Sequence, residues 1–271
     1  MEGLGIIRAM PSLDFAGKLV VVTGASSGLG RELALALALR ERAHVVAAAR
    51  RRDRLEALKS EIESRSTSRL HVVTVDLGEP DGPEELFAQA TSIGQVSALV
   101  NCAGVTFYGR TLEAPAETSR RIIAVDQLAP MRATELFLRY FLERGSGAIL
   151  TITSVYGLIP GPYQNVYAAA KHATQIFTEG LAGEYRGRGV TFCTVAAGSM
   201  ATEMIEHTGL DRRHGAGVFM DPARIARSAL SSFKKGRLVV IPGALYKFIV
   251  FLARVTPRRF GVWLSERIMR P

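Results

Sequence analysis

The residues of this sequence best suited to acid–base chemistry are a tyrosine and a lysine four positions apart. Tyr167 and Lys171 stand in the stretch NVYAAAK (165–171), and on an α-helix residues at this spacing share one face. An ammonium beside a phenol favours the ionised form, so the pair could give a proton to a substrate oxygen or take one from it. The alternative is a buried tyrosine beside a solvated lysine, which is the commoner arrangement for an isolated pair.

A glycine-rich turn near the N-terminus is suited to binding a phosphate group. In VVVTGASSGLGREL (20–33), an apolar run leads into Gly24, Gly28 and Gly30 and then into a helix-like segment. Such glycines let the backbone approach a pyrophosphate, whose charge is stabilised by the free N–H groups of a helix N-terminus. A turn without a ligand is the alternative, because the spacing G-x-x-x-G-x-G differs from the commoner G-x-G-x-x-G.

Two arginines follow the second apolar run, where dinucleotide-binding folds often place an acid against the ribose hydroxyl. Arg50 and Arg51 belong to the stretch ARRRDR (49–54), and the guanidinium fork fits the oxygens of a 2′-phosphate. A solvated charge run at the start of a helix is the alternative. Together with the glycine loop, the arginines favour NADP(H) over NAD as the cofactor.

Seven short apolar runs alternate with helix-like segments and would position these groups. Runs of this kind suit strands buried on both faces, and their alternation with helices is typical of a parallel sheet. The runs cover residues 18–23, 44–49, 70–75, 97–101, 148–153, 190–195 and 237–241. The stretch LALALAL (33–39) has the period of a strand, but Leu and Ala are strong helix formers, so we predict a helix there.

We therefore predict the α/β class, with a single doubly wound Rossmann-like domain and a parallel sheet of about seven strands. The domain covers residues 14–241, after a leader at 1–13 and before a basic amphipathic helical extension at 242–271. Under the switch-point rule, the carboxyl ends of the strands form the edge at which a ligand binds.

Composition narrows the class of protein further. The chain has 271 residues, of which 48% are hydrophobic and 22% charged, as is ordinary for a soluble globular protein. Cys102 and Cys193 lie far apart in apolar surroundings and predict neither a disulfide framework nor a metal site. The N-terminus has no long apolar stretch, so we predict no signal peptide and a cytoplasmic location.

The net charge of +9 is concentrated in the C-terminal extension. From Lys234 onward there are nine basic side chains and one acid, a net charge of +8 that leaves +1 for the first 233 residues. The basic residues are interrupted by Phe, Ile and Val, which disfavours nucleic-acid binding. The apolar run at 244–253 is too short to span a bilayer.

As a helix, the extension has an apolar face and a separate basic face. The apolar face contains Leu245, Phe248, Ile249, Leu252 and Val255, and the basic face contains Lys247, Arg254 and Arg258. Two alternatives are open: a helix lying on an anionic membrane surface, with the protein peripheral to it, or a helix packed on the domain or on a second subunit. The charge favours the membrane surface slightly.

Four motifs in order resemble the short-chain dehydrogenase/reductase superfamily. They are TGASSGLG (23–30), NCAG (101–104), Ser154 placed thirteen residues before the tyrosine, and YAAAK (167–171). The resemblance covers roughly residues 17–241 and implies hydride transfer between NADP(H) and a carbonyl or secondary alcohol, in a homodimer or homotetramer. The resemblance also favours the catalytic interpretation of Tyr167 and Lys171 over a buried tyrosine beside a solvated lysine.

The resemblance implies a role for each site residue. Tyr167 exchanges the proton, Lys171 lowers the tyrosine pKa and holds the nicotinamide ribose, and Ser154 hydrogen-bonds the substrate oxygen. Asp76 and Leu77 are implied at the adenine, Asn101, Ala103 and Gly104 on the ribose side, and Thr202 at the nicotinamide end. The full set implied to bind the cofactor is Gly24, Ser26, Ser27, Gly28, Leu29, Gly30, Arg50, Arg51, Asp76, Leu77, Asn101, Ala103, Gly104, Tyr167, Lys171, Gly198 and Thr202.

The sequence departs from the family pattern at two positions. Asp126 stands where the family usually has an asparagine whose backbone carbonyl holds a water in the proton relay. An aspartate carbonyl could serve as well, so we include Asp126 among the catalytic residues, but a carboxylate near Lys171 would partly cancel the charge that lowers the Tyr167 pKa. Ala197 replaces a proline before Gly198, which frees the backbone before Thr202.

The segment 199–220 is expected to cover the substrate. Its apolar residues are Met200, Met204, Ile205, Leu210, Val218, Phe219 and Met220, with Gly209, Gly215 and Gly217 as hinges, and Phe107, Tyr108 and Tyr163 are expected opposite. Methionines fill irregular apolar sites, so an apolar, lipid- or steroid-like carbonyl substrate is favoured over a sugar. The alternative function is a nucleotide-binding regulator of the same fold that has lost catalysis.

Overall fold

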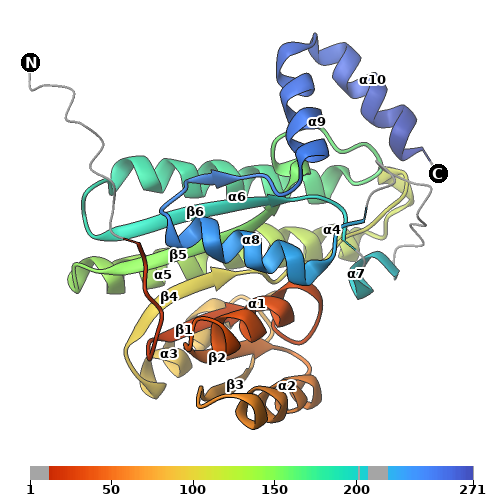
Figure 1. The fold of residues 1–271 in the computed structure, drawn as a ribbon. Coiled ribbons are helices and arrows are strands. Elements are labelled where there is room, and N and C mark those ends of the chain that lie inside the picture. The colour runs from red at the N-terminus through yellow and green to blue at the C-terminus, as the bar shows by residue number, and fades with distance from the viewer. Residues whose placement is uncertain (1–11, 201, 207–218, 271) are drawn as a thin grey trace, which may run out of the picture.

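Seven parallel strands form one sheet, and helices cover both of its faces (Figure 1). The computed structural model describes residues 12–200, 202–206 and 219–270. In space the strand order is β3-β2-β1-β4-β5-β6-β7. The strands are β1 (Leu19–Thr23), β2 (His44–Ala49), β3 (Leu70–Thr74), β4 (Val96–Asn101), β5 (Gly147–Ser154), β6 (Val190–Ala197) and β7 (Val239–Val240). This confirms the predicted doubly wound α/β domain.

Two layers of helices bury the two faces of the sheet. One layer consists of α1 (Gly28–Leu39), α2 (Arg52–Arg65) and α8 (Pro222–Lys234), and the other of α3 (Gly82–Ile93), α5 (Ala129–Glu143) and α6 (Asn165–Glu184). Successive strand residues face opposite layers, so Val20 and Val22 pack in the first core and Val21 in the second. The stretch 33–39 lies inside α1, which confirms the predicted helix.

The strand order reverses between β1 and β4, which are neighbours in the sheet although two strands separate them along the chain. The loops that follow these two strands leave the sheet in opposite directions, and a ligand cleft is expected where they part. Among the described residues, shorter helical elements lie in the connections between the strands, and two of them are labelled in Figure 1. They are η1 (Thr111–Glu113), α4 (Ala116–Ile123), the π-helical turn η2 (Ala124–Leu128), η3 (Val155–Gly157) and α7 (Glu203–Glu206).

The C-terminal extension forms two helices, α9 (Ala244–Val255) and α10 (Arg258–Met269), which project from the body of the domain (Figure 1). Tyr246 and Val250 are the buried side of α9 and pack on Val155 and Ile159. No helix in the described part of the chain is both long enough and apolar enough to cross a membrane.

The single apolar face predicted for the extension is divided in the structure. Leu245, Phe248 and Val255 are exposed, while Ile249 and Leu252 are half-buried. The reason is a contact that the pattern did not include: the Tyr246 hydroxyl accepts a hydrogen bond from the Ser199 N–H at 3.0 Å. This contact orients α9 so that Tyr246 and Val250, which lie beside the predicted apolar face, are turned toward the domain.

Candidate active site

Ser154, Tyr167 and Lys171 converge at the carboxyl edge of the sheet. Ser154 is the last residue of β5, and the other two lie one turn apart on α6. Ser154 lies close enough to the Tyr167 phenol to lower its pKa, and its hydroxyl accepts the Tyr156 N–H at 3.2 Å, which caps η3. Lys171 Nζ lies 5.7 Å from the centroid of the Tyr167 ring. The structure therefore brings together the three residues expected to exchange a proton.

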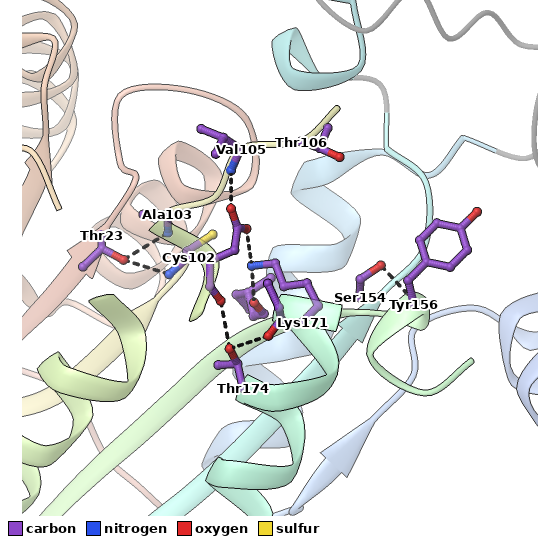
Figure 2. A network of polar contacts seen from close by, with 12 residues as sticks. Thr23, Cys102, Ala103, Val105, Thr106, Ser154, Tyr156, Lys171 and Thr174 are labelled. Carbon is purple, nitrogen blue, oxygen red and sulfur yellow. Dashed lines mark hydrogen bonds and ion pairs between the residues drawn. The ribbon is translucent and has the colours of Figure 1, made fainter. Parts of the chain in front are cut away.

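Asp126 forms a buried ion pair with Lys171. Asp126 Oδ1 lies 3.0 Å from Lys171 Nζ, and the two side chains are 0% and 6% exposed. The second carboxylate oxygen, Oδ2, accepts the Val105 N–H at 2.9 Å, while Nζ also contacts the Ile152 carbonyl at 3.4 Å. Figure 2 shows Lys171 between these groups, with Thr174 one turn further along the same helix.

The backbone carbonyl of Asp126 has a protein partner of its own. Thr174 Oγ1 lies 2.8 Å from this carbonyl and 2.9 Å from that of Ala170, so its hydroxyl can donate to either (Figure 2). Asp126 lies in the π-helical turn η2, and such turns leave carbonyls out of the regular helical pattern. A carbonyl has two lone pairs, so one position stays open to a water.

The two members of the ion pair shift each other's protonation. Burial raises the pKa of the Asp126 carboxyl, and the nearby Lys171 ammonium opposes this shift. Burial alone would lower the pKa of Lys171, but the Asp126 charge reverses the direction, so the pKa of Lys171 is raised. Two opposite charges 3.0 Å apart stabilise each other strongly away from water, and we treat the pair as ionised at neutral pH.

Tyr167 responds to the same charges. Burial in the cleft raises the pKa of its phenol, Lys171 and the Ser154 hydrogen bond lower it, and Asp126 raises it. The pKa of Tyr167 therefore lies above its ordinary value in this structure. The positive charge of an oxidised nicotinamide would act in the same direction as Lys171 and lower it.

The glycine loop between β1 and α1 leaves no room for side chains. Gly24 has φ +69° and Gly28 φ +53°, a region in which glycine is favoured. A Cβ added at Gly24 would lie 2.8 Å from Ala103, and one at Gly30 would lie 2.3 Å from the Gly24 carbonyl oxygen. The Thr23 hydroxyl supports this approach by accepting the N–H groups of Cys102 and Ala103 at 2.9 and 3.1 Å (Figure 2).

A cleft runs from this loop to Tyr167, and nearly all residues expected at the cofactor line it. The members that line it are Gly24, Ser26, Ser27, Gly28, Leu29, Gly30, Arg50, Arg51, Asp76, Leu77, Ala103, Gly104, Tyr167, Lys171, Gly198 and Thr202. Asn101 is the exception, since its side-chain amide points away and donates to the Thr134 hydroxyl at 2.9 Å. The structure therefore does not place Asn101 in the cleft.

Arginines and serines meet at the end of the cleft beside β2. Arg51 Nη2 lies 3.2 Å from Ser26 Oγ and 2.8 Å from Ser27 Oγ. Arg50 lies 4.0 Å from Asp76 and keeps 61% of its side chain exposed. Charged donors and hydroxyls of this kind fit a phosphate group, so the residues present are suited to the 2′-phosphate of NADP.

Several cleft residues were missed by the sequence reasoning. Arg121 on α4 binds the Asp76 carboxylate, and Tyr156 lines the cleft next to Ser154. No local pattern marks either of them. Arg54 does not line the cleft but shares a partner, Glu203, with Arg51, and their spacing of three residues could have predicted that both lie on one face.

The expected substrate residues divide between the cleft and the tail. Met200 and Met204 line the cleft, whereas Tyr108 and Tyr163 contact α10, through the Met269 carbonyl at 2.6 Å and Glu266 at 2.8 Å. Phe107 is not among the cleft residues. Leu210, Val218 and the three expected hinge glycines lie outside the described residues, and the side chain of Ile205 is not described.

No cluster of three or more metal-ligating side chains occurs within residues 12–200, 202–206 and 219–270.

Comparisons with known proteins identify the family of the chain. The family model described as short chain dehydrogenase matches residues 18–213. A short chain dehydrogenase of Pseudocercospora fijiensis is 35% identical over 69% of this chain, which spans 61% of that protein's length. Dehydrogenase/reductase SDR family member 7B of Danio rerio is 29% identical, with 96% and 88% of the two chains covered.

Solved structures show the same fold. A short-chain dehydrogenase from Sphingobium yanoikuyae in complex with NADPH superposes with a TM-score of 0.79 at 26% identity, covering 92% of this chain and 95% of that one. A 7beta-hydroxysteroid dehydrogenase superposes with a TM-score of 0.83 at 22% identity, covering 94% and 99%. The second likeness concerns the fold alone.

Proposed function

Because the chain belongs to the short-chain dehydrogenase/reductase superfamily, we propose that it is an NADP(H)-dependent oxidoreductase acting on carbonyl groups or secondary alcohols. The observation that carries the proposal is the meeting of Ser154, Tyr167 and Lys171 in the cleft that also contains the glycine loop. All three groups have the chemistry that the reaction needs. A nucleotide-binding regulator without catalysis would have no use for this arrangement.

The protein's own residues transfer the proton and orient the substrate. When bound, NADPH supplies the hydride that the carbonyl carbon accepts. Tyr167 donates the proton that neutralises the developing alkoxide, and Ser154 holds the same oxygen within hydrogen-bond distance. Lys171 stabilises the tyrosinate left behind, because its ammonium lies over the ring. Asp126 holds Lys171 in place through the ion pair.

The preference for NADP(H) rests on the basic end of the cleft. Arg50 and Arg51 would bind the 2′-phosphate, with the hydroxyls of Ser26 and Ser27 as further partners. Hydrogen bonds to charged groups contribute more than neutral ones. The NADPH complex of the Sphingobium yanoikuyae relative is consistent with this choice.

The opposite end of the cleft favours an apolar substrate. Val155, Tyr156, Met200 and Met204 line it near Ser154. Flexible methionines beside an aromatic ring suit a bulky hydrocarbon better than a sugar, whose hydroxyls would need partners. We propose a ketone or secondary alcohol with large apolar substituents, of a lipid-like or steroid-like kind.

The decisive experiment removes the phenol oxygen alone. In Tyr167→Phe, NADPH binding should stay within about twofold while turnover of a panel of bulky ketones falls by at least about a hundredfold, the usual contribution of a positioned acid. Lys171→Ala should lower both binding and turnover, because it contacts the phenol and the implied ribose site. Turnover of Tyr167→Phe within a few-fold of the parent would assign the proton to another group.

We also propose that α9 and α10 contact an anionic membrane surface. Large apolar side chains stay exposed on the pair, and they are Leu245, Phe248, Phe251, Val255, Phe260, Val262, Trp263 and Ile268. Basic side chains on the same two helices are Lys247, Arg254, Arg258, Arg259 and Arg267. Exposed aromatic groups beside positive charge match the chemistry of an interfacial helix.

The predicted packing of α9 on the domain and the proposed membrane contact are compatible. Tyr246 and Val250 are buried against the domain, which leaves the exposed side chains for a partner. The homodimer or homotetramer implied by the family stays a prediction, and light scattering of the purified protein would measure it. A cytoplasmic protein peripheral to a membrane is the proposal that follows.

A further inference from the structure

An acidic side chain pairs with two arginines beside the adenosine end of the cleft, of which Arg51 lines the cleft. Glu203 is the first residue of α7. Its Oε2 lies 2.9 Å from Arg51 Nη1, and its Oε1 lies 3.2 Å from Arg54 Nη1. The hydrogen bond from Arg51 is the main cause that holds the pKa of Glu203 below its ordinary value, and Ser27 adds another. The carboxylate is therefore charged at neutral pH.

Arg51, one of the two arginines that pair with Glu203, is also a residue that we assign to the 2′-phosphate. Arg51 directs Nη2 to the serines of the glycine loop and Nη1 to Glu203. A carboxylate and a phosphate both offer oxygen acceptors to a guanidinium fork. Since both anions need Arg51 and repel each other, a bound 2′-phosphate and Glu203 compete for this arginine.

The residues on either side of Glu203 lie across the implied cofactor site. A Cβ added at Gly28 would be 3.3 Å from a methyl carbon of Thr202, which therefore rests on the glycine loop. A Cβ added at Gly104 would be 3.6 Å from the terminal methyl of Met204. The segment 202–204 thus crosses the cleft from the pyrophosphate end toward Lys171, and the ion pairs of Glu203 tie it to α2.

We propose that Glu203 is an internal competitor of the 2′-phosphate and a determinant of cofactor specificity. Binding of the 2′-phosphate to Arg51 displaces Glu203 and frees the segment 202–204. NAD carries no group that can displace the carboxylate, so the segment stays tied when NAD approaches. The inference rests on the proposed preference for NADP(H). It adds a second cause of that preference, because only a cofactor with a 2′-phosphate can displace Glu203.

The test uses two ligands that differ only in the 2′-phosphate, adenosine 2′,5′-bisphosphate and 5′-AMP, with affinities measured by calorimetry. In Glu203→Gln, the bisphosphate should bind roughly three- to tenfold more tightly than to the parent, the size of losing one or two exposed ion pairs as competitors. Binding of 5′-AMP should change by less than about twofold in the same variant, because 5′-AMP does not compete with Glu203.

A matched control removes a similar charge nearby. Glu56 pairs with Arg52 on the same helix at 3.5 Å, whereas Glu203 pairs with Arg51, which lines the cleft. Glu56→Gln should leave the affinity for both ligands unchanged. Hydrogen exchange provides a second measurement: the amides of residues 202–206 should exchange faster when the parent binds the bisphosphate, and not when it binds 5′-AMP.

The possible outcomes distinguish a failure of the Glu203 competition from a failure of the NADP(H) preference. If the parent prefers the bisphosphate but Glu203→Gln binds it no better, the competition is refuted and the NADP(H) preference stands. If Glu203→Gln binds the bisphosphate more weakly, Glu203 positions Arg51 instead of competing for it, which also refutes the inference. If the parent binds both ligands equally, the NADP(H) preference itself fails, and the competition with it.

Discussion

Replacing Asp126 by asparagine tests how the buried ion pair sets the acidity of the catalytic phenol. The substitution keeps the shape of the side chain and leaves an oxygen able to accept the Val105 N–H. It removes the negative charge that raises the pKa of Tyr167 and leaves the positive charge of Lys171 that lowers it. The pKa of Tyr167 should therefore fall.

The structure limits the size of the shift. Lys171 Nζ is 5.7 Å from the Tyr167 ring centroid, and two unit charges at that distance interact by about 3 kcal/mol at an effective dielectric constant of about 20. The opposing effect of Asp126 is the smaller of the two, so Asp126→Asn should lower the pKa of Tyr167, with a change in its ionisation free energy of less than about 3 kcal/mol.

The assay follows alcohol oxidation as a function of pH, using kcat/KM with NADP⁺. Oxidation needs the tyrosinate as base, so the rate rises as pH passes the pKa of Tyr167. Because the variant has the lower pKa, the rise should occur at lower pH than in the parent. Thr174→Val is the control, since it removes the hydrogen bond to the Asp126 carbonyl and keeps the charge, so its profile should not move.

Two results would refute this reasoning. A profile of Asp126→Asn that coincides with the parent would mean that the carboxylate does not act on Tyr167. A shift to higher pH would mean that Lys171 loses its own proton when its partner is removed, so that its charge no longer assists the phenol. Thermal melting of each variant checks that the buried lysine has not unfolded the protein, because unpaired buried charges destabilise strongly.

Two further predictions concern the cofactor site and the C-terminal helices. Arg51→Asp should weaken NADPH binding by at least about tenfold and leave NADH binding nearly unchanged, since a charge-assisted contact contributes about 1.5–3 kcal/mol; equal affinity of the parent for both cofactors would contradict the assignment. Vesicles with anionic lipid should co-sediment with the parent at low salt and release it at high salt. The double substitution Phe248→Ser and Phe251→Ser should reduce this binding several-fold. Leu112→Ser is the control and should leave binding unchanged, because Leu112 is an apolar side chain that is 99% exposed outside the C-terminal helices. Binding that survives the double substitution would contradict the proposed surface.

The strands could be predicted closely from the sequence because burial on both faces leaves a distinctive run of apolar residues. The run at 44–49 coincides with β2, and the run at 190–195 lies within β6. The run at 237–241 is longer than β7, which has two residues. Within the described residues β7 is at the edge of the sheet and pairs with β6 alone, so hydrogen bonds to one neighbour decide its length and the apolar pattern does not.

The site could be predicted where its residues form motifs and not where they meet by folding. Tyr167 and Lys171 are one helical turn apart, so their proximity follows from spacing alone. The contact of Asp126 with Lys171 depends on how η2 lies against α6, and nothing local determines that. The same is true of Glu203, which is 152 positions from Arg51 along the chain, and of the turn of α9 toward Ser199.

Both ends of the cleft therefore hold positive charge matched by an acid, and burial decides what each acid can do. Asp126 is 0% exposed and has a protein partner on each carboxylate oxygen; moving it would strand a buried ammonium, at a cost of several kcal/mol. Glu203 is 32% exposed and begins a helix of four residues, where water can replace its partners at little cost. The first acid is thus a permanent part of the electrostatics at Tyr167, while the second can yield its place to a phosphate.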